Sequence, residues 1–249
     1  MLRGDAAHHL VRVLRAQTGQ LYELSDGQSV WLARTETIGK DAVEFALVEQ
    51  LPARCSPLKI MLLVAIVKFD RFEWAIEKAT ELGVDEIVPV AASRSEKGLI
   101  AASTKRAERW QKILLESAQQ SRRLSVPVLH GCVPPRAAFQ AAGGSTGLLL
   151  SELANAKPMR EVLEPVVAAS RPGQLVNLAL AIGPEGGWTE EEFALARASR
   201  FADVALGENI MRTETAVSAA LAALQYAFGN LAQGTHVEGV GTGRAGESV

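Results

Sequence analysis

Hydrophobic and polar residues follow two different periods along this chain of 249 residues, and the change of period divides it in two. The first part has a short amphipathic helical segment and then strand-like alternation in QLYELSDG, SVWLART and AVEFALVE, with SDGQ as a hairpin turn. This pattern predicts a small β domain. The next segment, LPARCSPLK, holds two prolines in a polar stretch and is typical of a linker. We therefore expect a first domain over residues 1–57.

From Leu58 onward, apolar runs of strand length alternate with segments of helical period. The runs are KIMLLVAIV, EIVPVA, VPVL, GLLL and LVNLALAIG, separated by patterns such as DRFEWAIEKATELG and PMREVLEPVVAA. This alternation predicts an α/β domain whose mostly parallel sheet is covered by helices on both faces. Ala216, Ala220 and Ala223 recur at helical spacing and predict a buried final helix. We expect this domain over residues 58–230 and a flexible tail over the glycine-rich residues 231–249.

Composition and charge restrict the function classes. A net charge of −2 argues against a protein that coats nucleic acid, because such binding neutralises many phosphates at once. The stretch between Arg94 and Arg123 is locally basic, which favours a local RNA contact, although a solvated helix face explains the same count. The apolar runs are short for a membrane helix, and no signal segment opens the sequence. We therefore expect a cytoplasmic protein with no membrane partner.

Two cysteines, Cys55 and Cys132, lie far apart and lack CxxC spacing. This spacing favours neither a disulfide framework nor a zinc ribbon. We expect both to be reduced packing residues, and we expect no metal site.

The strongest local signal for a ligand site is LALAIGPEGGWTEEEF. A buried strand is predicted to end at Ile182, a glycine turn follows, and Thr189 with Glu192 forms a capping box for the next helix. Glycines let the backbone approach a bound molecule, and ligands in open α/β sheets lie at the carboxyl ends of strands. The segment matches neither GxGxxG nor GxxxxGK[ST], which argues against a nicotinamide enzyme and a nucleotide hydrolase. A plain tight turn is the alternative interpretation.

A second signal is VALGENIMRTETAV, where a short strand, Gly207 and an irregular turn lead to a helix start at RTET. An arginine, a carboxylate and two hydroxyls gather there. Thr213 or Glu214 could simply cap the helix while Arg212 pairs with a surface acid, so the pattern alone leaves both interpretations open.

Together, IGPEGG, LG and RTETA resemble the last two motifs of the SPOUT methyltransferases. Within that superfamily they resemble the RsmE-like enzymes more than the ribose methylases. AHHLVRVLR, LSDG, KFDRFEWAIEKATELGVDEIVPV, SRSE and RWQKILLESAQQSRR extend the resemblance from about Gly4 to Gly229. It implies an α/β fold in which a SPOUT-type trefoil-knotted parallel-sheet methyltransferase domain follows a small N-terminal PUA-like β domain. It also implies S-adenosylmethionine as cofactor, a homodimer, and methylation of N3 of a uridine in the 16S ribosomal RNA of the small ribosomal subunit.

The resemblance also implies the residues of the site. Those of the methyl-donor pocket are Leu150, Ser151, Ile182, Gly183, Gly186, Gly187, Leu206, Gly207, Ile210 and Met211. For catalysis, the uridine imide must lose its proton. Our hypothesis is that Arg212 stabilises charge on the flanking carbonyl oxygens, while Glu214 accepts the proton or orients the arginine.

For RNA binding, His8, Arg12 and Arg15 fall at i, i+4 and i+7, which places them on one face of a predicted helix. A basic stripe of this kind is often only solvated. With the family resemblance, the residues expected to contact RNA are His9, Arg12, Arg15, Arg94 and Arg123. A satisfied core histidine is the alternative for His9.

The chain departs from the family pattern at three places. It starts almost at GDAAHHL, where relatives usually carry an extra strand, so the small domain is expected to lack its first strand or to begin upstream. Asn209 and Gln119 stand where relatives often have an arginine and a glutamate. The alternatives that stay open are a SPOUT enzyme acting on another RNA or on a ribose 2′-hydroxyl, and a non-catalytic ribosome-binding module.

Overall fold

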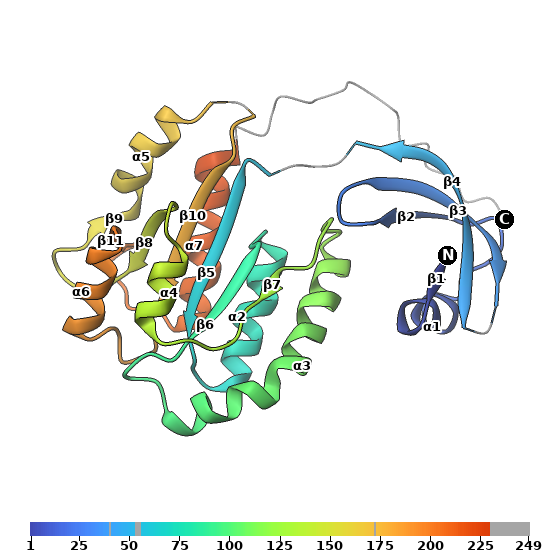
Figure 1. The fold of residues 1–249 in the computed structure, drawn as a ribbon. Helices are drawn as coiled ribbons and strands as arrows, with labels where there is room; N and C mark the ends of the chain where they lie inside the picture. The colour runs from blue at the N-terminus through green and yellow to red at the C-terminus, as the bar shows by residue number, and fades with distance from the viewer. Residues whose placement is uncertain (40, 53–55, 172, 230–249) are drawn as a thin grey trace.

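The computed structural model describes residues 1–39, 41–52, 56–171 and 173–229 (Figure 1). Its strands form two separate sheets, one of four strands and one of seven. The tail predicted over residues 231–249 lies outside the described residues, as does Cys55. Within the described ranges, no helix has both the length and the apolar character needed to cross a membrane.

The N-terminal sheet is antiparallel, with strand order β1-β4-β3-β2. Its strands are β1 (Leu2–Arg3), β2 (Leu21–Ser25), β3 (Val30–Ile38) and β4 (Ala42–Leu51). The predicted hairpin at SDGQ is confirmed, because the Asp26 carboxylate accepts the backbone N–H groups of Gln28 and Ser29 at 2.9 and 2.7 Å. Where we expected a first strand to be missing, the two-residue β1 precedes helix α1 (Asp5–Arg12) and pairs with β4.

The C-terminal sheet is parallel throughout, with strand order β7-β6-β5-β10-β8-β11-β9. Its strands are β5 (Leu58–Ala65), β6 (Glu86–Val90), β7 (Val128–Leu129), β8 (Thr146–Leu150), β9 (Lys157–Pro158), β10 (Val176–Ile182) and β11 (Phe201–Ala205). The predicted α/β class with a parallel sheet and a small β domain is therefore confirmed. The knot implied by the family resemblance stays a prediction.

Helices cover both faces of the parallel sheet (Figure 1). One layer contains α2 (Phe69–Glu81), α3 (Lys97–Gln120), α5 (Met159–Ala169) and α7 (Thr213–Phe228), and the other contains α4 (Pro135–Ala141) and α6 (Glu190–Ala198). Ala216 and Ala220 of α7 are buried and Ala223 is partly buried against the core, which confirms the buried final helix.

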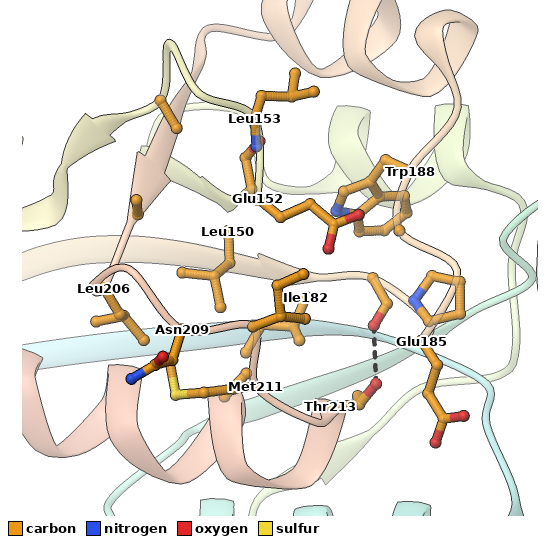
Figure 2. A pocket seen from close by; sticks show the side chains of 18 of the residues that line it. Leu150, Glu152, Leu153, Ile182, Glu185, Trp188, Leu206, Asn209, Met211 and Thr213 are labelled. Atoms are coloured by element: carbon orange, nitrogen blue, oxygen red, sulfur yellow. Dashed lines mark hydrogen bonds between the residues drawn. The ribbon is translucent and has the colours of Figure 1, made fainter.

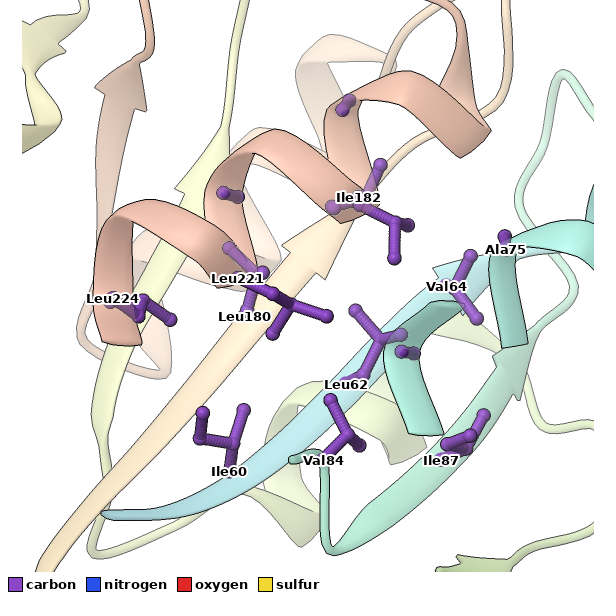
Figure 3. Packing of buried hydrophobic residues seen from close by; sticks show 14 of the residues in the cluster. Ile60, Leu62, Val64, Ala75, Val84, Ile87, Leu180, Ile182, Leu221 and Leu224 are labelled. Carbon is purple, nitrogen blue, oxygen red and sulfur yellow. The ribbon is translucent and has the colours of Figure 1, made fainter. Parts of the chain in front are cut away.

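Alternate residues of the central strands face opposite layers. Ile60, Leu62 and Val64 of β5 pack with α2 and α7, whereas Leu63 and Ala65 belong to the core beneath α4 and α6. Figure 3 shows the first set, with Leu180 of β10 beside Leu221 and Leu224 of α7, and Ile87 of β6 on the side of Ala75 of α2. Because both faces of these strands are buried, their sequences are continuously apolar instead of alternating. This packing fixes the strand ends from which the ligand site is built.

The N-terminal domain contacts the C-terminal domain near the turn between β2 and β3. The Ser25 hydroxyl donates to the Leu124 carbonyl at 3.0 Å, which joins the small domain to the loop that follows α3. The basic helix α3 therefore runs between the two parts of the molecule (Figure 1).

Candidate active site

Three neighbouring strands of the parallel sheet end at one edge, at Ile182 of β10, Leu150 of β8 and Ala205 of β11. The loops that follow them line a cavity of about 510 Å³ (Figure 2). Small-molecule sites in proteins commonly measure roughly 300–1,000 Å³, and the carboxyl ends of parallel strands are where such ligands bind. The cavity is therefore the strongest candidate for the ligand site.

Most of the residues predicted for the methyl-donor pocket line this cavity. Nine of the ten do so: Leu150, Ser151, Ile182, Gly183, Gly187, Leu206, Gly207, Ile210 and Met211. The tenth, Gly186, is not among the lining residues, and its carbonyl instead accepts a hydrogen bond from the Arg94 guanidinium. The structure thus brings together three segments that are far apart in the sequence, while their binding role stays a prediction.

The glycine turn after β10 is anchored at its far end by the predicted capping box, which is confirmed. The Thr189 hydroxyl accepts the Glu192 N–H at 3.3 Å, and the Glu192 carboxylate accepts the Thr189 N–H at 2.7 Å. The other oxygen of the buried Glu192 accepts the N–H of Ser93 at 2.8 Å. One carboxylate therefore fixes both the start of α6 and the loop that carries Arg94.

The start of α7 is tied to the same turn. The buried Thr213 hydroxyl donates to the Gly183 carbonyl at 3.1 Å, the dashed contact in Figure 2. Arg212 occupies the N-cap position, and no side chain caps this helix. The interpretation that Thr213 or Glu214 caps this helix is therefore wrong. Thr213 instead connects two walls of the cavity.

Two glycines of the turn are close to neighbouring side chains. Gly187 has a φ of +70°, and a Cβ added there would lie 2.9 Å from the Glu152 Oε1 atom. A Cβ added to Gly183 would lie 3.1 Å from the Trp188 indole. The positive φ of Gly187 favours glycine there, and at Gly183 a side chain would require the Trp188 indole to shift.

A second, smaller recess of about 300 Å³ adjoins the cavity. Its lining residues are Arg71, Glu185, Ile210, Met211 and Arg212, of which Glu185, Ile210 and Met211 also line the cavity. The two spaces are therefore neighbours that share a wall. Arg212, predicted to be catalytic, faces the recess and not the cavity.

Arg71 is a site residue that the sequence reasoning missed. Its guanidinium forms an ion pair with Glu185, and its Nε atom lies 4.0 Å from Glu214 Oε1. The Glu214 side chain is 14% exposed, and its buried Oε2 atom has no hydrogen-bond partner within the described part of the chain. The sequence does show an arginine in the first turn of the helix that follows the central strand β5. Nothing near it in the sequence indicates a contact with residue 214.

The predicted RNA-binding residues of the small domain are exposed, but they do not share one helical face. Helix α1 ends at Arg12, and Arg15 follows it with a φ of +49°, so the helical spacing predicted for Arg15 is wrong. His8 is paired with Asp41, Nε2 to Oδ1 at 2.8 Å. His9 is exposed and is therefore not a core histidine.

Arg123 has an internal position that the sequence did not predict. Its side chain is 13% exposed and donates to the carbonyls of Thr80 and Val84 at 2.9 and 2.6 Å. Burial lowers the pKa of Arg123, opposed by the nearby Asp85 carboxylate. The guanidinium thus holds together the loop between α2 and β6, which corrects the surface position expected for it.

Two basic residues of α3 likewise form ion pairs within the molecule. Arg109 pairs with Glu73 of α2, Nη2 to Oε2 at 2.8 Å, and Arg106 contacts the same carboxylate at 3.4 Å.

Cys132 is partly buried and packs against the main core, and burial raises the pKa of its thiol. Among the residues with described positions, no group of three or more His, Cys, Asp or Glu side chains is placed to hold a metal ion.

Comparison with protein-family models assigns the class of protein that has this fold and site. A model described as an RNA methyltransferase domain matches residues 54–225, and one described as an RNA methyltransferase PUA domain matches residues 2–48. The chain belongs to the RNA methyltransferase family.

Named relatives narrow this class. Proteins named ribosomal RNA small subunit methyltransferase E are 35% identical in Synechocystis, covering 86% of this chain and 69% of the relative, and 30% identical in Bacillus subtilis, covering 90% and 89%. The crystal structure of the Neisseria gonorrhoeae enzyme of that name, bound to S-adenosylmethionine, is 32% identical with a TM-score of 0.77 and covers 90% of both chains. The predicted RsmE-like membership is confirmed.

Proposed function

We propose that this enzyme transfers the methyl group of S-adenosylmethionine to N3 of a uridine in small-subunit ribosomal RNA. The observation that carries the proposal is the pair of adjoining spaces at the strand ends. One is a cavity large enough for the methyl donor, and the other is a recess lined by Arg212 and by Arg71, whose Nε atom lies 4.0 Å from Glu214 Oε1. A donor and a planar acceptor base could be held side by side across the shared wall.

The residues of the cavity fit the proposed donor. Leu150, Ile182, Leu206 and Met211 supply apolar walls suited to the adenine ring (Figure 2). Four carboxylates, those of Glu152, Glu185, Glu190 and Glu208, line the cavity against one guanidinium, that of Arg94. An excess of negative charge favours a cationic ligand such as a sulfonium. A Cβ added to Gly207 would meet nothing within 4 Å, so that backbone lies against open space.

For the chemistry, S-adenosylmethionine supplies an already activated methyl group, so the chain must orient the acceptor nitrogen and remove its proton. Uridine N3 carries an imide proton between two carbonyl groups. We assign Glu214 as the base that accepts this proton and Arg212 as the donor that stabilises negative charge on the carbonyl oxygens. Glu214 lies in the first turn of α7, where the helix dipole favours a carboxylate.

Arg71 completes this arrangement as a positioning residue. It lies between Glu185 of the glycine turn and Glu214 of α7, so it can hold the carboxylate of the base toward the recess. The buried Glu214 Oε2 has no hydrogen-bond partner within the described residues, so the protein leaves its capacity to accept a proton unused.

RNA capture is assigned to the small domain, for which we keep the proposed bounds 1–57, with the catalytic domain over residues 58–230. The exposed His9, Arg12 and Arg15 would contact phosphates, which position an RNA without reading its sequence. Because its substrate is ribosomal RNA, we place the enzyme in the cytoplasm.

We further propose a homodimer formed through α7. On its outer side, Tyr226 is 90% exposed and follows the small residues Ala219 and Ala222, and the exposed Trp74 lies on the contacting helix α2. Exposed aromatic residues beside small ones favour close packing with a second copy around a twofold axis. Tyr226→Lys should shift the chain from dimer to monomer in analytical ultracentrifugation, whereas an unchanged mass would contradict this interface.

The function is tested by incubating the enzyme with radiolabelled S-adenosylmethionine and small ribosomal subunits or bare 16S RNA, followed by nucleoside analysis. We expect label in 3-methyluridine. Label in a ribose-methylated nucleoside would replace the proposed acceptor, and absence of both transfer and donor binding would favour a non-catalytic module.

A further inference from the structure

Two opposite charges flank Gly187 at one end of the cavity. Arg94 comes from the loop between β6 and α3, and Glu152 comes from the loop after β8. A Cβ added to Gly187 would lie 2.9 Å from Glu152 Oε1 and 3.8 Å from Arg94 Nη1. In the described part of the chain, neither side chain has an ion-pair partner. Both charges are therefore available to a ligand.

Hydrogen bonds and packing hold Arg94 in this position. The buried Glu192 carboxylate holds the preceding residue, Ser93, by its N–H at 2.8 Å. The Arg94 guanidinium donates one N–H to the Gly186 carbonyl, and a Cβ added to Gly186 would lie 3.3 Å from Arg94 Cδ. The arginine stem thus packs along a glycine that has no side chain to displace it. A guanidinium has five N–H groups, so donors remain for a bound anion.

The rest of the cavity differs in character. Figure 2 shows Leu206 and Met211 on the opposite side of the cavity from Glu152 and Trp188, so a more apolar end and a charged end can be distinguished. S-adenosylmethionine has the same polarity, with an aromatic adenosine at one end and an amino acid that carries a carboxylate and an ammonium at the other. A zwitterion fits a guanidinium and a carboxylate that are close together but not paired.

We propose that Arg94 binds the carboxylate, and Glu152 the ammonium, of the amino-acid end of S-adenosylmethionine. This inference rests on the proposed function, and it assigns Arg94 to the methyl donor in place of the RNA contact expected from the sequence. Gly187 then acts by leaving the space between the two charged groups open.

The test is calorimetric titration of the full chain with three probes. S-adenosylmethionine has the sulfonium and the amino-acid end, S-adenosylhomocysteine has the amino-acid end without the sulfonium charge, and methylthioadenosine lacks the amino-acid end. The variants are Arg94→Met, which keeps the stem, Arg94→Lys, which keeps the charge, and Glu152→Gln. Arg106→Met is the matched control, because Arg106 pairs with Glu73 and does not line the cavity.

We expect Arg94→Met and Glu152→Gln each to weaken both amino-acid-bearing probes about tenfold, the loss of one charged hydrogen bond, and to leave methylthioadenosine within about twofold. Arg94→Lys should recover part of the loss, and the control should bind all three probes as the wild type does.

Equal weakening of all three probes would overturn the proposal, because Arg94 would then only support the loop. No weakening of any probe would overturn it as well. If Glu152→Gln weakens the binding of S-adenosylmethionine but not that of S-adenosylhomocysteine, the Glu152 carboxylate lies at the sulfonium. That result would overturn its assignment to the ammonium. A wild-type chain that binds none of the probes would overturn the proposed function itself, a result visible before any variant is examined.

Discussion

The strand-end cavity and the N-terminal sheet differ in how well the surrounding structure supports them. The loops of the cavity stand on a sheet with both faces buried, and Glu192 and Thr213 fasten them to one another. The N-terminal sheet instead has a core cluster of three buried residues, Ala7, Leu10 and Val43, and it leaves Leu47 and Val48 exposed. Preorganisation reduces the entropic cost of ligand binding, so the small-molecule site benefits from rigidity that a surface contacting RNA phosphates does not require. Changes in the two regions should therefore affect different measurements.

The largest effect is expected from the proposed base. Glu214→Gln should lower the rate of methyl transfer about 100-fold or more, because general-base catalysis commonly contributes that much. The affinity for S-adenosylmethionine should stay within about threefold, since Glu214 does not line the cavity. Single-turnover kinetics and calorimetry measure the two quantities, and Glu164→Gln on the exposed side of α5 is the control. A Glu214→Gln enzyme with a near-normal rate would remove Glu214 from the mechanism.

Arg212→Ala should also act on the rate, by about 100-fold, because it removes a donor that stabilises developing negative charge. Arg71→Met should give a smaller loss, and the double variant with Glu214→Gln should be no slower than Glu214→Gln alone, since Arg71 acts through Glu214. Fully additive losses would show that Arg71 acts independently of the base.

Next in size is the effect of filling the glycine turn. Gly187→Ala adds a Cβ at a positive φ and against Glu152, so we expect about tenfold weaker binding of the methyl donor and roughly 1–3 kcal/mol lower stability. Gly144→Ala is the matched control, because Gly144 has a φ of +92°, open space around its Cβ position and no place in the cavity. Both variants should lower the melting temperature, but only Gly187→Ala should weaken the donor. Equal donor affinities in the two variants would disprove the close approach.

The small domain should respond in the opposite way. Arg12→Ala should weaken RNA binding several-fold and reduce the slope of log affinity against log salt by about one, the signature of one lost phosphate contact. Donor affinity should not change. Arg160→Ala on α5 removes an exposed charge from the other domain and should leave RNA binding unaltered. An unchanged salt slope for Arg12→Ala would remove this residue from the RNA surface.

The smallest effect concerns the link between two walls of the cavity. Thr213→Val keeps the shape of the side chain but removes the bond to the Gly183 carbonyl, which should cost about 1 kcal/mol of stability. Chemical denaturation measures this, with the exposed Thr104→Val on α3 as the control. Identical stabilities of Thr213→Val and wild type would show that the link is dispensable.

The strand ends and the glycine turn could be predicted because their signals are local. The apolar run ending at Ile182 and the capping box of Thr189 with Glu192 lie within a few residues of one another in the sequence. Helix ends are less well specified, and α1 stops at Arg12 although the basic spacing continues to Arg15. A helix boundary depends on capping and packing that the spacing of charges does not report.

Long-range placements could not be predicted. Arg71 meets Glu185 and Glu214 only because β5 and β10 are neighbours and α2 lies beside α7. Arg94 and Arg123 are both arginines in the same basic stretch, yet one reaches the cavity and the other binds two internal carbonyls. Residue type and local charge are the same for both, so only the tertiary structure separates their roles.

The proposed methylation of uridine N3 is tested by mapping the methylated nucleotides of small-subunit ribosomal RNA from cells that lack this protein. We expect one uridine to lose its N3 methyl group, the wild-type chain to restore it, and the Glu214→Gln chain not to restore it. If the ribosomal RNA keeps every N3-methyluridine without this protein, or loses a ribose methyl group instead, the chain is not the proposed uridine-N3 methyltransferase.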